Sequence, residues 1–153
     1  DGQVELTQQM IFQSGRPVLV FPAAQAALGI GRVVVAGDGS RSAARALADA
    51  LPILERAGSV RVVTFLNEKD TATPGLGAEV VRHLQAHGIG ATAEDVDVQG
   101  RRIGRALDDY LATSPAYLVV MGAFGHSRLR EFVLGGATRH MLHDPKTPLL
   151  LAH

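Results

Sequence analysis

The sequence predicts an α/β fold: a doubly wound sheet of five parallel strands in the order 3-2-1-4-5, with helices on both faces. Short apolar, β-branched runs alternate with helix-like segments from residue 32 to the end of the chain. Unbroken apolar runs are typical of parallel strands buried on both faces, and helices connect such strands as right-handed crossovers. The 153 residues are 46% apolar and 20% charged, which is typical of one globular domain with its own core.

The elements follow in order along the chain. The expected strands are residues 32–36, 60–66, 91–98, 117–121 and 148–152. The third strand is the most polar, and we expect it at a sheet edge. The first helix begins after Ser40, a good N-cap, but Pro52 interrupts its pattern and predicts a kink there or a break at Leu51. The other helices of this region are expected at residues 76–87, 101–112 and 136–143.

The first residues resemble the end of the chain when they are shifted by 131 positions. Four residues recur, since Thr7, Met10, Pro17 and Leu19 fall on Thr138, Met141, Pro148 and Leu150. Chance similarity between two short helix–proline–strand pieces is the alternative, but the order agrees throughout, so we favour a repeat. We therefore expect the last helix and strand of a preceding repeat in residues 1–21, a linker in residues 22–31 and a complete domain in residues 32–153.

Charge and composition exclude several classes of function. The chain has 15 basic and 15 acidic side chains and no cysteine, so it lacks the basic excess of a nucleic-acid-binding protein and the ligands of a thiolate metal site. Its apolar runs are too short to cross a bilayer and no leader opens it, so we expect a cytoplasmic protein without a membrane partner. His83 and His87 lack a third ligand and are expected to be an exposed pair. We expect His140 and His143 to interact with a helix dipole.

Glycines cluster after the strand at residues 117–121. Gly122 and Gly125 follow it directly, and Gly135 and Gly136 open the next helix. Glycine lets the backbone approach a phosphate closely, and the free N–H groups of a helix start favour an anion. The alternative is that these glycines only form a turn and a close helix–strand contact.

Asp38 ends the first strand, which neighbours the fourth in the predicted order. The winding of the sheet reverses between these strands, and ligands bind at such a switch point. Asp38 and the glycines therefore converge on one place. Alternatively, Asp38 only braces its own turn.

Taken together, these motifs resemble the universal stress protein family. Its pattern is Gly-x2-Gly-x9-Gly-Ser/Thr followed by a last strand that begins with proline, and residues 122–136 and 148–151 are similar to it. The first strand of the family typically ends in Asp-Gly-Ser, here Asp38-Gly39-Ser40. The resemblance covers residues 32–153 and implies an adenine-nucleotide alpha hydrolase-like fold. With the repeat at residues 4–21, it suggests the tandem form of the family.

The resemblance also implies a nucleotide site. In nucleotide-binding members the aspartate meets adenosine, the end of the second strand contacts adenine through its backbone, and the glycines hold the ribose and phosphates. The matching positions here are Asp38, Phe65, Gly122, Gly125, Gly135, Gly136 and Thr138. Gly136 departs from the family, because nucleotide binders have a Ser or Thr hydroxyl there for a phosphate oxygen. Thr138 retains a hydroxyl two residues on. The loop residues His126, Arg128 and Arg130 either add charge near the phosphates or lie in solvent.

The family implies a stress-response regulatory module that binds ATP or a related adenine nucleotide, with Mg²⁺ as a companion cation. No general base is evident, so we name no catalytic residue and expect at most slow ATP hydrolysis. A small enzyme on this scaffold would need an acid or base that the sequence does not show. The alternative, favoured by Gly136, is a nucleotide-free interaction protein that works through dimerisation. Family members typically dimerise through their last strands, so we expect residues 18–21 to pair with residues 149–152, within one chain or between two chains.

Overall fold

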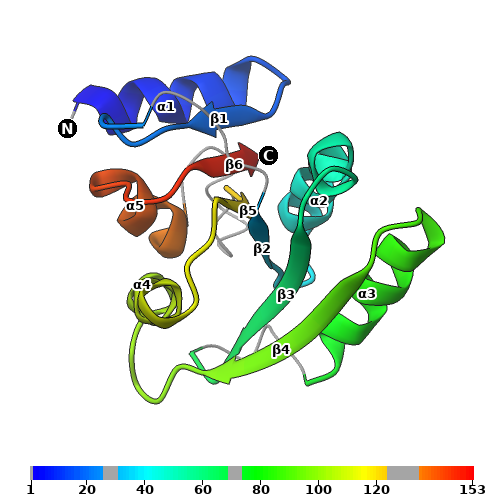
Figure 1. The fold of residues 1–153 in the computed structure, drawn as a ribbon. Helices are drawn as coiled ribbons and strands as arrows, with labels where there is room; N and C mark the ends of the chain where they lie inside the picture. Colours follow the sequence, from blue (N-terminus) through cyan, green and yellow to red (C-terminus); the bar gives the residue numbers. More distant parts are fainter. Residues whose placement is uncertain (1, 26–30, 69–73, 124–134) are drawn as a thin grey trace.

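The computed structural model describes residues 2–25, 31–68, 74–123 and 135–153. Within them, six strands form one sheet in the order β1-β6-β5-β2-β3-β4 (Figure 1). The strands are β1 (Val18–Val20), β2 (Arg32–Ala36), β3 (Ser59–Leu66), β4 (Ala91–Asp97), β5 (Leu118–Gly122) and β6 (Leu149–Ala152). The helices are α1 (Gly2–Gln13), α2 (Arg41–Leu54), α3 (Leu76–Ala86), α4 (Ile103–Thr113) and α5 (Gly136–His143).

The predicted fold class is confirmed. The strands β2 to β6 are all parallel, and from one edge they run β4-β3-β2-β5-β6, which is the predicted order. β4 lies at the edge, as its polar sequence indicated. The sheet differs from the five-stranded prediction by one further strand, because β1 pairs antiparallel with β6 and forms the other edge.

Helices cover both faces of the sheet, with α2 and α3 on one side and α1, α4 and α5 on the other (Figure 1). Successive strand residues alternate between the two cores, as period-two geometry requires. Val34, Val63 and Val119 pack toward α4 and α5, whereas Val33 and Val62 pack toward α2 and α3. The apolar runs are therefore buried on both faces, as the parallel arrangement predicted.

The break predicted in α2 does not occur. Ser40 is the N-cap as expected, but the helix continues through Pro52 to Leu54. Proline removes one N–H donor and crowds the carbonyl of the preceding turn. Here it lies in the last turn, where the fully buried Ala50 and the almost fully buried Leu54 hold both sides of it in the core. A break at Leu51 is therefore wrong, because the packing of the last turn outweighs one missing hydrogen bond. The alternative, a kink at Pro52, stays a prediction.

The predicted pairing of the first strand with the last is confirmed within the chain. Val18, Leu19 and Val20 lie opposite Leu151, Leu150 and Leu149. Phe21 follows β1 and lies outside the ladder. α1 packs through Val4 and Ile11 into the core that α5 also covers.

Candidate functional site

The strand register brings the predicted site together at one edge of the sheet. Ala36 lies opposite Met121 as the last paired position of β2 and β5. Asp38 and Ala123 are each two residues beyond that pair, at the carboxyl ends of their strands. Gly135 N donates a hydrogen bond to Ala123 O at 3.3 Å, which brings the start of α5 to the same edge. The start of α2, which follows the turn of Asp38, lies against Gly122, and the start of α5 reaches Ala123, so both helix starts lie at the carboxyl end of β5.

The turn between β2 and α2 is held by its own side chains. Asp38 is half-buried, and its Oδ1 accepts a hydrogen bond from Ser40 N at 2.9 Å. Ser40 Oγ accepts from Ala43 N at 3.2 Å and caps the helix. Gly39 has a φ of 78°, in the left-handed region that glycine adopts without strain. Asp38 thus braces its turn, as the simpler interpretation predicted, and it also lies at the switch point.

Gly122 is required by a close contact between β5 and α2. A Cβ at this position would overlap Ser42 Oγ and would lie 2.5 Å from Ala43 N. Ala43 N is a backbone atom of the first turn of α2 and cannot move away without shifting the helix. The structure therefore supplies a packing reason for this glycine, whereas its predicted role beside a phosphate stays a prediction.

Thr138 points into the protein. Its side chain is 1% exposed, and its Oγ1 donates to Gly122 O at 3.1 Å. The hydroxyl joins the first turn of α5 to the end of β5. It is thus a structural donor, which the sequence pattern did not reveal.

The start of α5 is open to solvent. Its N-cap, Gly135, has an extended backbone and no side chain that could accept a hydrogen bond from the helix. Gly136 is exposed, and a Cβ there would meet no atom of the described residues within 4 Å. The first N–H groups of a helix have no intrahelical acceptor, so they present donors and a positive dipole end at this edge. Gly125 and the basic loop residues lie outside the described residues.

Phe65 lies at the end of the neighbouring strand, β3. Its side chain is 5% exposed and packs into the core beneath α4. The ladder between β2 and β3 ends at Val63, whose carbonyl accepts from Gly37 N at 3.2 Å. Phe65 lies two residues further along β3. Because backbone groups alternate between the two sides of a strand, the N–H and C=O of Phe65 point to the same side as Val63 O. That side lies beyond the end of β2 and next to the turn of Asp38.

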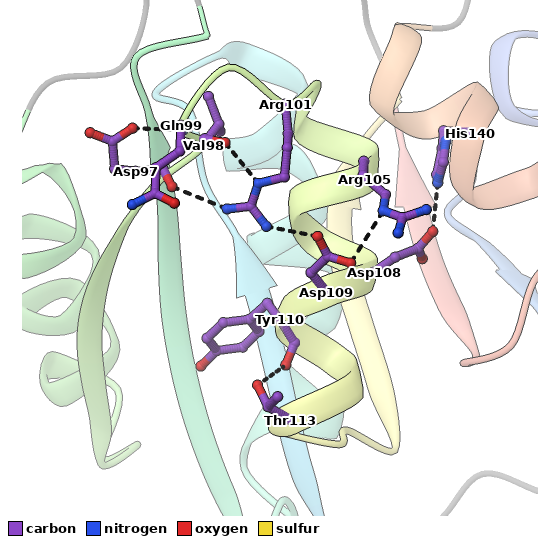
Figure 2. Close-up of polar contacts among 10 residues, drawn as sticks. All are labelled: Asp97, Val98, Gln99, Arg101, Arg105, Asp108, Asp109, Tyr110, Thr113 and His140. Atoms are coloured by element: carbon purple, nitrogen blue, oxygen red, sulfur yellow. Dashed lines mark hydrogen bonds and ion pairs between the residues drawn. The ribbon is translucent and has the colours of Figure 1, made fainter.

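A polar network joins the loop after β4 to α4 (Figure 2). Arg101 donates from Nε to Val98 O at 2.8 Å and from Nη1 to Asp109 Oδ2 at 2.8 Å. Arg105 adds an ion pair to Asp109 at 3.2 Å. The hydrogen bond from Arg101 is the main cause that lowers the pKa of Asp109. The Glu68 side chain accepts a hydrogen bond from Ile103 N and so caps the start of α4.

His140 fixes α5 against α4. Its Nε2 lies 2.6 Å from Asp108 Oδ2, as Figure 2 shows, and a Cβ on Gly104 would lie 2.6 Å from its Cγ. The ring therefore packs directly over Gly104. The sequence predicted a helix-dipole role for His140 and did not indicate its contact with Asp108. A glycine inside the α4 sequence was the available signal, because it marks a close approach.

Two further expectations concern metals and membranes. Among the described residues, no three His, Asp or Glu side chains gather closely enough to hold a metal ion. The rings of His83 and His87 lie at a tilt of 55° with centroids 4.7 Å apart, and His87 Nδ1 lies 3.0 Å from His83 O. Within the same described ranges, no helix combines the length and the hydropathy needed to cross a membrane.

The sequence and the fold both match known proteins. Residues 29–153 match the model of the Universal stress protein family. A search of curated protein sequences found no match. A solved universal stress protein from Archaeoglobus fulgidus DSM 4304 superposes with a TM-score of 0.75 and 21% sequence identity, over 96% of this chain and 54% of that one. This chain thus spans about half the length of that protein.

Two further solved structures are matched over almost their whole length. A universal stress protein from Archaeoglobus fulgidus has a TM-score of 0.65 and 18% identity, over 82% of this chain and all of that one (100%). A universal stress protein in complex with cAMP has a TM-score of 0.56 and 21% identity, over 80% of this chain and 97% of that one. At these identities the superpositions show a shared fold.

Proposed function

Because the chain belongs to the universal stress protein family, we propose that it binds ATP or a related adenine nucleotide at the carboxyl edge of β2 and β5, and that this binding regulates its action in a stress response. The observation that supports the proposal is that the turn of Asp38 and the start of α5 both lie at the carboxyl edge of β2 and β5. Asp38 lies two residues beyond the last paired position of β2 and β5, and the start of α5 is bonded to Ala123, two residues beyond the same pair on β5.

The phosphates are proposed to lie at the start of α5. The helix offers unpaired N–H donors and the positive end of its dipole, which together favour an anion. The space around Gly136 lets a phosphate approach the backbone without meeting a side chain. Mg²⁺ would accompany the phosphates as their counter-ion.

The adenosine is proposed to lie between Asp38 and the end of β3. A carboxylate accepts hydrogen bonds from ribose hydroxyls, and the backbone N–H and C=O of Phe65 match the donor–acceptor edge of adenine. A solved universal stress protein of the same fold binds cAMP, which also carries adenine and ribose. That neighbour supports the class of ligand.

Titration calorimetry with ATP, with and without Mg²⁺, tests the proposal. We expect saturable heat with one site per chain and a melting temperature that rises with ATP. A ligand at 100 times its Kd adds about 2.7 kcal/mol to the free energy of unfolding, so the shift is measurable. The absence of both heat and a thermal shift at millimolar ATP contradicts binding.

Asp38→Asn is the matched variant for this titration. The amide oxygen can still accept from Ser40 N, so the turn stays braced while the negative charge is lost. We expect weaker ATP binding with little change in the melting temperature without ligand. Equal affinity in both proteins would place the ribose elsewhere.

A nucleotide-free interaction protein is the second candidate function. Gly136 supplies no hydroxyl, and the hydroxyl of Thr138 is already bound to Gly122 O. Mass spectrometry of small molecules that accompany the purified protein separates the two candidates. A co-purified adenine nucleotide supports the first, and a protein that carries none and gives no heat with ATP supports the second.

A further inference from the structure

The starts of α2 and α5 lie on opposite sides of one residue, Gly122. A Cβ built on Gly122 would lie 2.5 Å from Ala43 N, in the first turn of α2. The carbonyl oxygen of Gly122 accepts a hydrogen bond of 3.1 Å from Thr138 Oγ1, in the first turn of α5. The positive ends of two helix dipoles therefore flank the carboxyl end of β5.

Arg41 is the first helical residue of α2, and its side chain is exposed. Arg45 lies one turn further on the same helix face and donates from Nη2 to Gly15 O at 3.4 Å. Gly15 precedes β1, whose first residue, Val18, pairs with Leu151 near the carboxyl end of β6. The helix face that carries both arginines is therefore turned toward β6. Because α2 begins beside the end of β5, Arg41 lies at the carboxyl end of these two neighbouring strands.

The charges around Arg41 do not favour a cation there. The start of a helix carries the positive end of its dipole, and α2 has no acidic residue in its first turn. Arg45, at the i+4 position, has the same charge and is bound to Asp49 at 3.1 Å. Within the part of the chain that the structure describes, no ion pair or side-chain hydrogen bond engages Arg41.

The arginines at the start of α4 provide a contrast. Arg101 and Arg105 both form ion pairs with Asp109, at 2.8 Å and 3.2 Å. Their charges are thus neutralised inside the protein, whereas the charge of Arg41 is left for a ligand. An anion bound at the end of β5 would relieve the unfavourable interaction of Arg41 with the dipole of α2.

We propose that Arg41 binds a phosphate group of the nucleotide, across Gly122 from the start of α5, and so makes the site selective for nucleotides over nucleosides. This inference rests on the proposed function, because it adds a residue to the same site. A guanidinium group stays charged in proteins and can donate two parallel hydrogen bonds to a phosphate. Arg41 would thus supply from α2 the side-chain donor that Gly136 does not supply from α5.

Calorimetry with ATP and with adenosine tests the inference on Arg41→Gln. We expect the Kd for ATP to rise roughly tenfold or more, because a hydrogen-bonded charge is lost, while the Kd for adenosine stays the same. Arg45→Gln is the matched control, since it removes the same charge one turn away, and it should leave ATP binding nearly unchanged. Equal ATP affinity in the wild type and Arg41→Gln overturns the inference and leaves the proposed function intact. Equal losses in the two variants also overturn it, because net charge alone is then the cause.

Inorganic tripolyphosphate separates this inference from the proposed function. We expect the wild type to bind it more weakly than ATP, and Arg41→Gln to bind it more weakly still. Binding of tripolyphosphate that depends on Arg41, with no binding of ATP or adenosine, would overturn the proposed function and keep Arg41 as a phosphate ligand. A wild type that binds neither ATP nor tripolyphosphate overturns both.

The stability of Arg41→Gln without ligand provides a further test. Removing a cation from the start of α2 and from the i+4 position of Arg45 should leave the melting temperature unchanged or slightly higher. Arg41→Lys keeps the charge and loses the paired donors, so its affinity for ATP should lie between those of the wild type and Arg41→Gln. A clear fall in the melting temperature of Arg41→Gln would assign Arg41 a structural role and overturn the inference.

Discussion

Thr138 Oγ1 and Gly122 O are joined by a hydrogen bond of 3.1 Å that ties the first turn of α5 to the end of β5. Both residues belong to the glycine-rich motif, yet neither presents a side-chain donor to solvent. The motif therefore has a structural layer, made by these two residues and Ser42, beneath an exposed layer that begins at Gly136.

Gly122→Ala should destabilise the fold even without any ligand. The new methyl group would overlap the first turn of α2, and overpacking of this kind costs about 1–3 kcal/mol. Urea unfolding followed by circular dichroism measures the loss. Gly136→Ala is the matched control, because its methyl group enters open space, and it should change the free energy of unfolding by less than about 0.5 kcal/mol. Similar effects of the two variants would show that Gly122 is not held against α2.

Thr138→Val should also lower stability. The isosteric valine removes the donor of the hydrogen bond that joins α5 to β5, and such a bond contributes about 0.5–1.5 kcal/mol. Thr138→Ser keeps the hydroxyl and should retain most of the stability. Thr7→Val is the repeat-matched control, since the Thr7 hydroxyl bonds within its own helix, and should have the smaller effect in the same unfolding assay. A larger effect at Thr7 contradicts this assignment.

Gly136→Ser should tighten ATP binding if the phosphates lie at the start of α5. The serine supplies a hydroxyl, and a hydrogen bond to a charged group contributes about 1.5–3 kcal/mol, or roughly tenfold or more in Kd. Calorimetry on Gly136→Ala provides the comparison, because alanine adds bulk without a hydroxyl. Unchanged or weaker binding in the serine variant would mean that Gly136 serves another geometry.

Asp109→Asn should lower stability near neutral pH and have little effect in acid. Hydrogen bonding to Arg101 lowers the pKa of Asp109 in the folded protein, so the carboxylate stabilises the fold above its ordinary pKa of 3.8. That contribution is lost as the pH falls through the lowered value. Urea midpoints measured at pH 7 and at about pH 2 should therefore differ between wild type and variant only at the higher pH.

Arg101→Gln is the partner variant for this measurement. It should reproduce the pH dependence of Asp109→Asn, and the double variant should lose less than the sum of the two. Additive losses would show that the two side chains act independently.

The sequence was most informative where burial alone decides the structure. The runs at β2, β3 and β5 are buried on both faces, so their composition predicted a parallel sheet, and the repeat predicted the neighbour of β6. The directions in which side chains point were harder to predict from the sequence. Nothing in the pattern tells whether the hydroxyl of Thr138 faces a ligand or a backbone carbonyl, because both need the same residue.

Contacts between distant segments explain the other differences. Gly122 lies close to α2, and Gly104 lies close to His140. Both contacts depend on how the helices pack in three dimensions, and a short stretch of sequence does not carry that information. Pro52 is tolerated for a similar reason, since the packing of its neighbours outweighs one lost hydrogen bond.

The acidic strand β4 limits how far this sheet can grow. Glu94, Asp95 and Asp97 are exposed along it, and Glu94 is held in place by the hydroxyl of Tyr110 at 2.8 Å. Two such edges brought together would place carboxylates opposite one another, which opposes pairing. Further strands can therefore join the sheet by backbone pairing only at the β1 edge. Two molecules paired through that edge would leave only their β4 edges free, so such an assembly would stop at two molecules and would not form a filament.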